Sequence, residues 1–270
     1  MKKNLMFLLV WTVCLLCHTL CAGADGNGRP SQGQPWSVSG LDMKFVYIAP
    51  GNFQMGSNEG RNDEKPVHHV TISKGYWLGK YEVTQSEYQT ITGDNPSNFK
   101  GGNKPVDSVN WNDAVSFCKK LTERERAAGR LPAGYEYRLP TEAEWEFAAR
   151  GGTASRGYEY SGSDNLDSAA WYQTNTGGET HAVGIKSANE LGIYDMSGNV
   201  CEWCGDLYKN YSDSSLADPM GATEGTDRVY RGGSWYNGSR GCRVANRNSN
   251  SPNNISNYVG FRVALACSPK

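Results

Sequence analysis

The chain has 270 residues and a formal net charge of −1, a length that suits one large domain or two small ones. This near-neutral balance excludes a broad electrostatic footprint for nucleic acid or an anionic membrane, so no nucleic-acid partner is expected. Tyrosine and tryptophan are plentiful, with 15 and 8 copies against 7 phenylalanines, which is typical of a compact domain with many irregular segments.

Residues 1–24 have the layout of a secretory signal peptide. Two lysines precede an apolar run from Leu5 to Leu16, and the small residues Ala22-Gly23-Ala24 follow. The run is too short to span a bilayer. Cys21 raises the alternative of a lipoprotein, although the residues before it match a lipobox poorly. We therefore expect export, either as a cell-surface or outer-membrane lipoprotein with a lipid anchor or as a secreted protein.

A flexible tether is expected next, because residues 25–40 are rich in Gly, Pro, Gln and Ser. The folded domain should then occupy residues 41–270. Within it, Met43–Met55 alternates apolar stretches with turn residues, which predicts a hairpin that turns at Pro50-Gly51-Asn52. Further strands are predicted at Val67–Ile72 and Tyr76–Leu78.

Capping boxes predict three helices, which begin after Thr84, Asn110 and Thr141. The first should end near Ile91. In the second, apolar residues recur at helical spacing on one face, at Ala114, Phe117, Cys118 and Leu121. After Gly151 the helical signals stop, but aromatic residues remain frequent, and disordered segments are poor in them. An ordered, loop-rich second half is therefore expected.

Several motifs occur in a fixed order along residues 41–266: PGNFQMGS, EKPVHHVTIS, YWLGKYEVTQSEY, PVDSVNWNDAVSFCKKL, YRLPTEAEWEFAARGG, NELGIYDMSGNVCEW, RVYRGGSW and GFRVA. Together they resemble the formylglycine-generating-enzyme, or sulfatase-modifying-factor, family. The resemblance implies an α+β C-type lectin fold in that family's variant, with two main helices, small antiparallel sheets and long ordered loops. The family includes copper-dependent cysteine oxidases, iron-dependent sulfoxide synthases and non-catalytic members.

The resemblance also indicates where an oxidase would carry its copper-binding cysteine pair. Those two positions fall on Ser239 and Val244, and neither is cysteine. Cys242 lies between them, and one thiol cannot form a two-thiolate copper(I) site. No histidine stands nearby to activate it. We therefore interpret Cys242 as buried or disulfide-bonded, and predict no catalytic residue.

Cys201 and Cys204 form a CxxC motif without the partners that would give it a function. A zinc site needs a second pair at suitable spacing, and a redox site needs a thioredoxin-like context. Five cysteines follow the expected tether, at 118, 201, 204, 242 and 267. In an exported protein some of them can pair, but the sequence leaves their connectivity open.

The loop that begins at Asp195 resembles a calcium-binding loop of some family members. The resemblance would make ligands of the side chains of Asp195 and Glu202 and of the carbonyls of Gly198 and Val200, and such oxygen ligands suit Ca²⁺. The alternative is a metal-free turn in which Asp195 bonds backbone amides. Both interpretations stay open. Any such calcium would be structural, and no cofactor is required.

The segment Tyr236–Tyr258 has an unusual composition. Seven Asn and four Ser lie between residues 237 and 257, and the whole segment contains no Lys, Glu, Gln, Met or Trp. An Asn codon with its two adenines randomised and a pyrimidine in third place can encode Asn, Ser, Tyr, Ile, Gly, Asp, Arg or Cys. It cannot encode Lys, Glu, Gln, Met or Trp. This pattern indicates a diversity-generating retroelement, and the chain is similar to exported variable proteins of spirochaetes such as Treponema. The alternative is an ordinary Asn-rich loop.

We therefore predict a variable ligand-binding segment over about 230–258, because antibody paratopes use the same mixture of Tyr, Ser, Gly and Asn. The predicted contact residues are Tyr230, Tyr236, Gly238, Ser239, Arg240, Gly241, Asn246, Ser249, Ser251, Ile255, Ser256 and Tyr258. The predicted scaffold residues are Arg231, Trp235, Arg243, Arg247, Pro252 and Arg262.

The function predicted from these patterns is that of a non-enzymatic receptor or adhesin, and the chain is expected to be a monomer. Its partner would be an unidentified protein or surface ligand that differs between strains. The rival functions are a formylglycine-type cysteine oxidase and a purely structural envelope protein.

Overall fold

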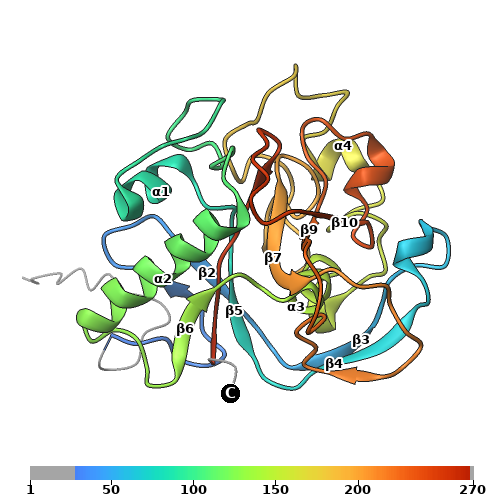
Figure 1. Cartoon of the computed structure of the whole chain (residues 1–270), viewed down its shortest axis with the longest axis horizontal. Helices are drawn as coiled ribbons and strands as arrows, with labels where there is room; N and C mark the ends of the chain where they lie inside the picture. Colours follow the sequence, from blue (N-terminus) through green and yellow to red (C-terminus); the bar gives the residue numbers. More distant parts are fainter. Residues whose placement is uncertain (1–27, 268–270) are drawn as a thin grey trace, which may run out of the picture.

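The computed structural model describes residues 28–267 (Figure 1). The expected signal peptide lies outside the described residues. A five-stranded antiparallel sheet joins the two ends of the described chain, because its C-terminal strand β12 pairs between β5 and β6. In spatial order its strands are β1 (Trp36–Ser37), β2 (Lys44–Ile48), β5 (Tyr76–Gly79), β12 (Ala264–Cys267) and β6 (Tyr135–Arg138).

Two smaller sheets complete the strand arrangement. The first has the order β10 (Arg247–Asn250), β9 (Arg228–Arg231), β7 (Cys201–Leu207) and β11 (Val259–Gly260). The second has the order β3 (Gly51–Met55), β4 (His68–Ile72) and β8 (Leu216–Ala217). Most pairs are antiparallel, but β11 runs parallel to β7 and β8 runs parallel to β4. These two short parallel pairs were not predicted.

The three predicted helices are confirmed, each with its capping box. They are α1 (Gln85–Thr92), α2 (Trp111–Ala127) and α3 (Glu142–Ala149). The apolar face predicted for α2 is buried, and Phe117 packs on Phe261 with ring centroids 5.3 Å apart. Figure 1 shows α1 and α2 on one side of the molecule, and β7, β9 and β10 on the other.

Short helical turns connect the longer elements. They are α4 (Leu166–Ala169), η1 (Asn62–Glu64), η2 (Gly152–Ala154) and η3 (Ser239–Cys242). None of the helices within residues 28–267 has the length and apolar character that a membrane crossing requires.

The predicted hairpin over Met43–Met55 is wrong, although both of its strands form. β2 pairs with β1 and β5, whereas β3 pairs with β4 in a different sheet. Phe53 of β3 packs on Phe147 of α3, with ring centroids 5.3 Å apart. The local alternation of residues predicts a strand but not the strand with which it pairs. Here β3 packs against α3 and therefore lies in a different sheet from β2.

The predicted tether is also wrong for its described part, residues 28–40. Trp36 is only 5% exposed, and its Nε1 donates a hydrogen bond of 2.9 Å to the hydroxyl of Tyr137. The Nε1 of Trp77 donates to the carbonyl of Gln34 at 2.7 Å. The prediction relied on the Gly- and Pro-rich composition and did not weigh Trp36. Burial of the Trp36 ring holds residues 28–40 against the sheet.

Candidate ligand-binding face

The segment Tyr236–Tyr258 is an ordered part of the domain. It contains η3, forms the whole of β10, and leads into β11 through a loop. All four residues of β10 pair with β9, from Arg247 opposite Arg231 to Asn250 opposite Arg228. Figure 1 shows the orange-red ribbon of this segment at the end of the molecule that also carries α4. The segment is therefore a folded surface and not a linker.

Two buried arginines tie this segment to α3. Arg231 is fully buried, and its guanidinium pairs with the Glu146 carboxylate and also donates to the carbonyls of Ala245 and Asn246. Arg247 forms a bidentate pair with Glu142, with N–O distances of 2.7 and 2.6 Å. A buried charge is tolerated only when it is paired and hydrogen-bonded. The predicted scaffold roles of Arg231 and Arg247 are confirmed.

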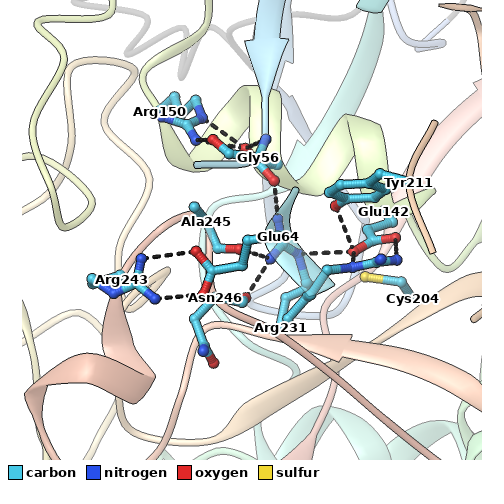
Figure 2. A network of polar contacts seen from close by, with 12 residues as sticks. Gly56, Glu64, Glu142, Arg150, Cys204, Tyr211, Arg231, Arg243, Ala245 and Asn246 are labelled. Carbon is cyan, nitrogen blue, oxygen red and sulfur yellow. Dashed lines mark hydrogen bonds and ion pairs between the residues drawn. The ribbon is translucent and has the colours of Figure 1, made fainter. Parts of the chain in front are cut away.

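Arg243 makes a third tie, from the middle of the segment to η1. Its Nη1 donates at 2.9 Å to Glu64, whose side chain is fully buried. Burial alone would raise the pKa of Glu64, but the hydrogen bonds from Arg243 and from the Arg61 backbone outweigh it and lower the pKa. Figure 2 shows Arg231 at the centre of the network, between the Arg243–Glu64 pair and Glu142 with Tyr211. The segment is thus fastened at three neighbouring points, all within residues 243–247.

On either side of these ties along the chain, most predicted contact residues reach solvent. Tyr236 is 59% exposed and Ile255 is 61% exposed. The other exposed positions are Gly238, Ser239, Arg240 and Ser251, and the partly exposed positions are Tyr230, Gly241, Ser249, Ser256 and Tyr258. Asn246 alone is buried at 4%, and its Oδ1 accepts a hydrogen bond from Asn248. Asn246 is therefore the predicted contact residue that the fold covers most completely.

An aromatic cluster forms one part of this face. The rings of Tyr236 and Tyr258 stack with centroids 6.0 Å apart, and the edge of Tyr236 meets Trp235 at 5.6 Å. Beneath them Trp235 packs against Phe99 at 5.1 Å and donates from Nε1 to the Asn257 carbonyl at 3.0 Å. Such ring pairs add rigidity as well as buried area. The cluster presents two tyrosines to solvent on a fixed support, as predicted for Trp235.

A cleft of about 870 Å³ forms the other part of the candidate ligand-binding face. Its walls are residues 56–61, residues 157–164 and the stretch 237–248. Charged side chains of both signs line it: Arg61, Arg150, Arg240, Arg243, Glu59, Glu159 and Asp164. Arg240 is exposed and has no ionic partner within residues 28–267. The cleft can therefore bind polar groups, and Arg240 is a cation available to a ligand.

Residues far away in the sequence also support this face and were not predicted. The backbone amide of Gln173 donates to the Asn237 carbonyl at 3.0 Å. In a second contact of this kind, the Nδ2 of Asn112 donates a hydrogen bond to the Oδ1 of Asn253 at 2.9 Å. No local pattern marks Gln173 or Asn112, because their partners lie more than 60 residues further along the chain.

In the loop after Asp195, one carboxylate of the calcium ligand set taken from the resemblance is paired with an arginine. Both carboxylate oxygens of Glu202 receive hydrogen bonds of 2.6 Å from Arg262, and the Nε1 of Trp145 donates to one of them at 2.7 Å. Within residues 28–267 no group of three or more His, Cys, Asp or Glu side chains could hold a metal ion. A buried arginine therefore neutralises Glu202 in this structure, and the calcium ligand set of Asp195, Gly198, Val200 and Glu202 stays a prediction.

Asp195 instead belongs to a buried acidic cluster below Trp235. Its Oδ2 accepts a hydrogen bond of 2.7 Å from the Gly184 amide, as the metal-free turn requires. Burial raises the pKa of Asp195 to about 6, against an opposing effect of that hydrogen bond. Burial and the neighbouring carboxylates also raise the pKa of Glu82, which accepts from the Asn199 side chain at 2.7 Å. The Asn199 carbonyl in turn accepts from the Trp235 amide at 2.8 Å.

The cysteines were predicted from the sequence only in part. Cys242 is fully buried, as predicted, and burial raises the pKa of its thiol to about 12. Cys201 and Cys204 lie in different core clusters, so their CxxC motif is not a paired site. The sequence indicates only a single thiol at Cys242, whereas the structure packs its sulfur against Gly233, where an added Cβ atom would lie 2.9 Å from it.

Comparison with known proteins agrees with this architecture. Residues 38–267 match the sulfatase-modifying factor enzyme 1-like domain. The structure resembles that of Treponema denticola variable protein 1, with a TM-score of 0.77 and 34% identity over 87% of this chain and 98% of that one. This likeness confirms the predicted C-type lectin fold.

Two sequence relatives extend the comparison. A protein of Paenibacillus barcinonensis named chaperone protein LppX is 34% identical over 97% of this chain and 99% of its own length. The formylglycine-generating enzyme of Streptomyces coelicolor is 38% identical over 180 residues, which are 60% of this chain and 52% of that enzyme. On the domain match and these relatives, the chain belongs to the sulfatase-modifying factor enzyme 1-like, or formylglycine-generating-enzyme, family.

Proposed function

We propose that this chain is an exported, non-enzymatic receptor or adhesin. It binds a protein or another surface ligand through the face that the segment Tyr236–Tyr258 forms. A diversity-generating retroelement varies that segment, so the ligand differs between strains. One observation carries the proposal. Within a single segment, the charged anchors are buried, whereas the exposed positions hold residues that a randomised Asn codon can encode.

The anchors make variation structurally tolerable. Arg231, Arg243 and Arg247 hold the segment through backbone carbonyls and through glutamates of η1 and α3. None of these contacts uses the side chains of Ser239, Arg240 or Ile255. Binding residues displayed on loops over a rigid support are the usual arrangement of a recognition surface. Substitution at the exposed positions can therefore change the ligand without unfolding the domain.

The composition of the exposed positions supports binding. Tyrosine supplies rigid contact area at low entropic cost, while Ser, Gly and Asn supply adaptable hydrogen bonds. Tyr236 and Tyr258 provide the first kind of group, and Ser239 and Ser251 provide the second. The 34% identity to a Treponema denticola protein that is named a variable protein adds independent support.

Sequencing of this locus from many isolates tests the proposal. We expect substitutions at Tyr236, Ser239, Arg240 and Ile255, all caused by changes at adenines, and a near-identical template repeat beside a reverse-transcriptase gene. Trp235 and the three anchoring arginines serve as the internal control and should stay unchanged. Substitutions spread evenly over anchors and exposed positions, or no template, would refute diversification by a retroelement.

The rival function is a formylglycine-type cysteine oxidase, which the 38% identity to the Streptomyces coelicolor enzyme favours. A sulfatase-motif peptide incubated with the full chain and copper(I) distinguishes the two functions. Receptor function predicts no aldehyde above the background of free copper. Turnover that disappears in Cys242→Ala would establish the oxidase and reject the receptor as the sole function.

A further inference from the structure

The cleft beside the segment Tyr236–Tyr258 has two walls that the segment does not supply. They are residues 56–61 and residues 157–164, and the rest of the lining includes residues 237–248. Both walls are bonded to the segment. The Nη1 of Arg61 donates to the Oδ1 of Asn248 at 3.2 Å, and the Val244 amide donates to the Glu159 carbonyl at 3.0 Å. The fixed walls, 56–61 and 157–164, therefore keep a set position relative to the segment.

Three of the four arginines that line the cleft already have a carboxylate partner. Each forms an ion pair with an acidic residue that does not line the cleft: Arg61 with Asp63, Arg150 with Glu146, and Arg243 with Glu64. Arg240 is the fourth, and it forms no ion pair within residues 28–267. Only one of the four positive charges is therefore without a partner inside the domain.

The acidic residues of the cleft are in the opposite situation. Glu59, Glu159 and Asp164 are exposed, and none of the three forms an ion pair within the described part of the chain. The Asp164 carboxylate accepts a hydrogen bond of 2.9 Å from the Glu159 amide, which leaves its charge in place. Three unpaired carboxylates thus face one unpaired guanidinium. The balance of free charge in the cleft is negative and attracts a cationic group.

A nearly buried amide adds a second requirement. Asn246 is 4% exposed and lines the cleft, and its Oδ1 accepts from the Asn248 side chain at 2.9 Å. Its Nδ2 donates to no group within residues 28–267. In Figure 2 the Asn246 amide points away from the network around Arg231. Because buried donors are normally hydrogen-bonded, this Nδ2 is available to an acceptor of a ligand.

Together these groups distinguish between the common classes of ligand. A nucleic acid or an acidic glycan would bring its negative charges to Glu59 and Glu159. A polyamine would neutralise the carboxylates but has no acceptor for Asn246 or Arg240. A polypeptide supplies both kinds of group, because its lysine and arginine side chains are donors and its main-chain carbonyls are acceptors.

We propose that the cleft binds a lysine or arginine side chain of a protein ligand. The carboxylates of Glu59, Glu159 and Asp164 hold the basic group, and the Asn246 Nδ2 donates to a main-chain carbonyl of the ligand. This inference rests on the proposed function and names the class of partner. The three carboxylates lie outside the segment Tyr236–Tyr258, so every variant of the segment shares the requirement for a basic side chain. Variation at Arg240 changes only the contacts around it.

Selection of peptides on the full chain tests the inference. The probe is a display library of random peptides, and the enriched peptides are then synthesised and their affinities measured at low salt. We expect them to share a lysine or arginine at one position. Their affinity for the variant Glu59→Gln/Glu159→Gln should be about tenfold weaker, because charge-assisted hydrogen bonds are lost.

A matched control separates the cleft from the net charge of the chain. The variant Glu123→Gln/Glu224→Gln also removes two exposed carboxylates, but neither lies in the cleft, so the affinity should stay unchanged. Equal losses in the two double variants would overturn the inference. A peptide with glutamine in place of the shared basic residue should bind the natural chain about tenfold more weakly. It should bind Glu59→Gln/Glu159→Gln as well as the original peptide does.

A second selection, on Arg240→Ser, separates the fixed walls from the variable segment. The enriched peptides should keep the basic residue and differ at other positions. Three results would overturn the inference: loss of the basic residue in this selection, no shared basic residue on the natural chain, or no enriched peptide at all. None of them bears on diversification of the segment, which sequencing of the locus decides. The two proposals can therefore fail separately.

Discussion

The helical half of the domain, residues 84–150, and the loop-rich half, residues 151–267, keep their shapes by different means. In the first, α2 buries an apolar face that includes Phe117 and Leu121. In the second, three arginines are almost fully buried, and each pairs with a glutamate: Arg231, Arg247 and Arg262. Polar residues poor in helix or strand propensity can thus form a rigid surface when buried charges connect them to a rigid element.

The third helix is where the two halves meet. All eight residues of α3 are buried, and its glutamates Glu142 and Glu146 face the arginines of the loop-rich half. The cap at Thr141 positions the first turn of the helix from local contacts alone. A locally specified helix therefore carries the partners for charges that arrive much later in the sequence. The following predictions test how independent the two halves are.

The largest effect should follow from the loss of a buried anchor. Arg231→Ala leaves the Ala245 and Asn246 carbonyls and part of Glu146 without a partner, so the free energy of unfolding should fall by about 3–5 kcal/mol. Urea denaturation measures it. The matched control is Lys44→Ala, whose partner Asp42 is 87% exposed, and its loss should change the same quantity by less than about 1 kcal/mol. Similar values for the two variants would contradict the anchor role.

The next effect is a pH dependence caused by Asp195. The pKa of Asp195 is raised from 3.8 to about 6, so the folded state binds this proton more tightly than the unfolded state. Its favourable contribution is therefore present below about pH 4 and is lost as the pH rises through about 6. The amide that Asp195→Asn introduces cannot titrate, but its oxygen can still accept from the Gly184 amide.

The variant should therefore gain stability relative to the natural protein by about 2–3 kcal/mol between pH 4 and pH 7. Chemical denaturation at several pH values gives both curves. The pairs Glu146–Arg231 and Glu64–Arg243 are common to both proteins, so their own pH dependence cancels in the difference. Parallel curves would show that Asp195 does not titrate in this range.

A smaller effect should follow from the loss of a helix cap in the other half. Thr84→Ala removes the hydroxyl that accepts from the Glu87 amide and should lower the free energy of unfolding by about 1 kcal/mol. Gln89→Ala, on the exposed side of the same helix, is the control and should be nearly neutral. The binding face should keep its shape in Thr84→Ala, because its ties end on α3 and η1 and not on α1.

The smallest effect is expected at the binding face itself. Ile255→Ser replaces a side chain that is 61% exposed, so the free energy of unfolding should change by no more than about 0.5 kcal/mol. Val244→Ser, in the same segment but 2% exposed, should cost about 2 kcal/mol or more. Equal losses of unfolding free energy at the two positions would mean that the segment is not divided into buried structural residues and exposed residues that the fold does not need.

Local patterns predicted the elements whose interactions span few residues. Each capping box joins residues three apart, so the starts of α1, α2 and α3 could be inferred from short stretches. The face of α2 that is buried follows from its helical period. The unusual composition of Tyr236–Tyr258 also marked the segment that lies at the surface, and the ordered motifs identified the family.

Tertiary contacts decided the rest, because they connect residues that no local pattern relates. The Arg231–Glu146 pair spans 85 positions, and the pairing of β3 with β4 in place of β2 depends on what α3 covers. The prediction of a flexible tether was wrong for residues 28–40 because Trp36 is buried against β6 and bonds Tyr137, 101 residues further along the chain. The partner of Glu202 could not be predicted either, because Arg262 lies 60 residues further along the chain.

The sequence by itself determined the family, the helix starts and the position of the Asn-rich segment Tyr236–Tyr258, since each depends on neighbouring residues or on composition. The tertiary structure alone decided which arginines hold that segment and which of its residues reach solvent. The physical reason is that burial and charge pairing depend on distance in space. Only the folded chain brings such distant residues into contact.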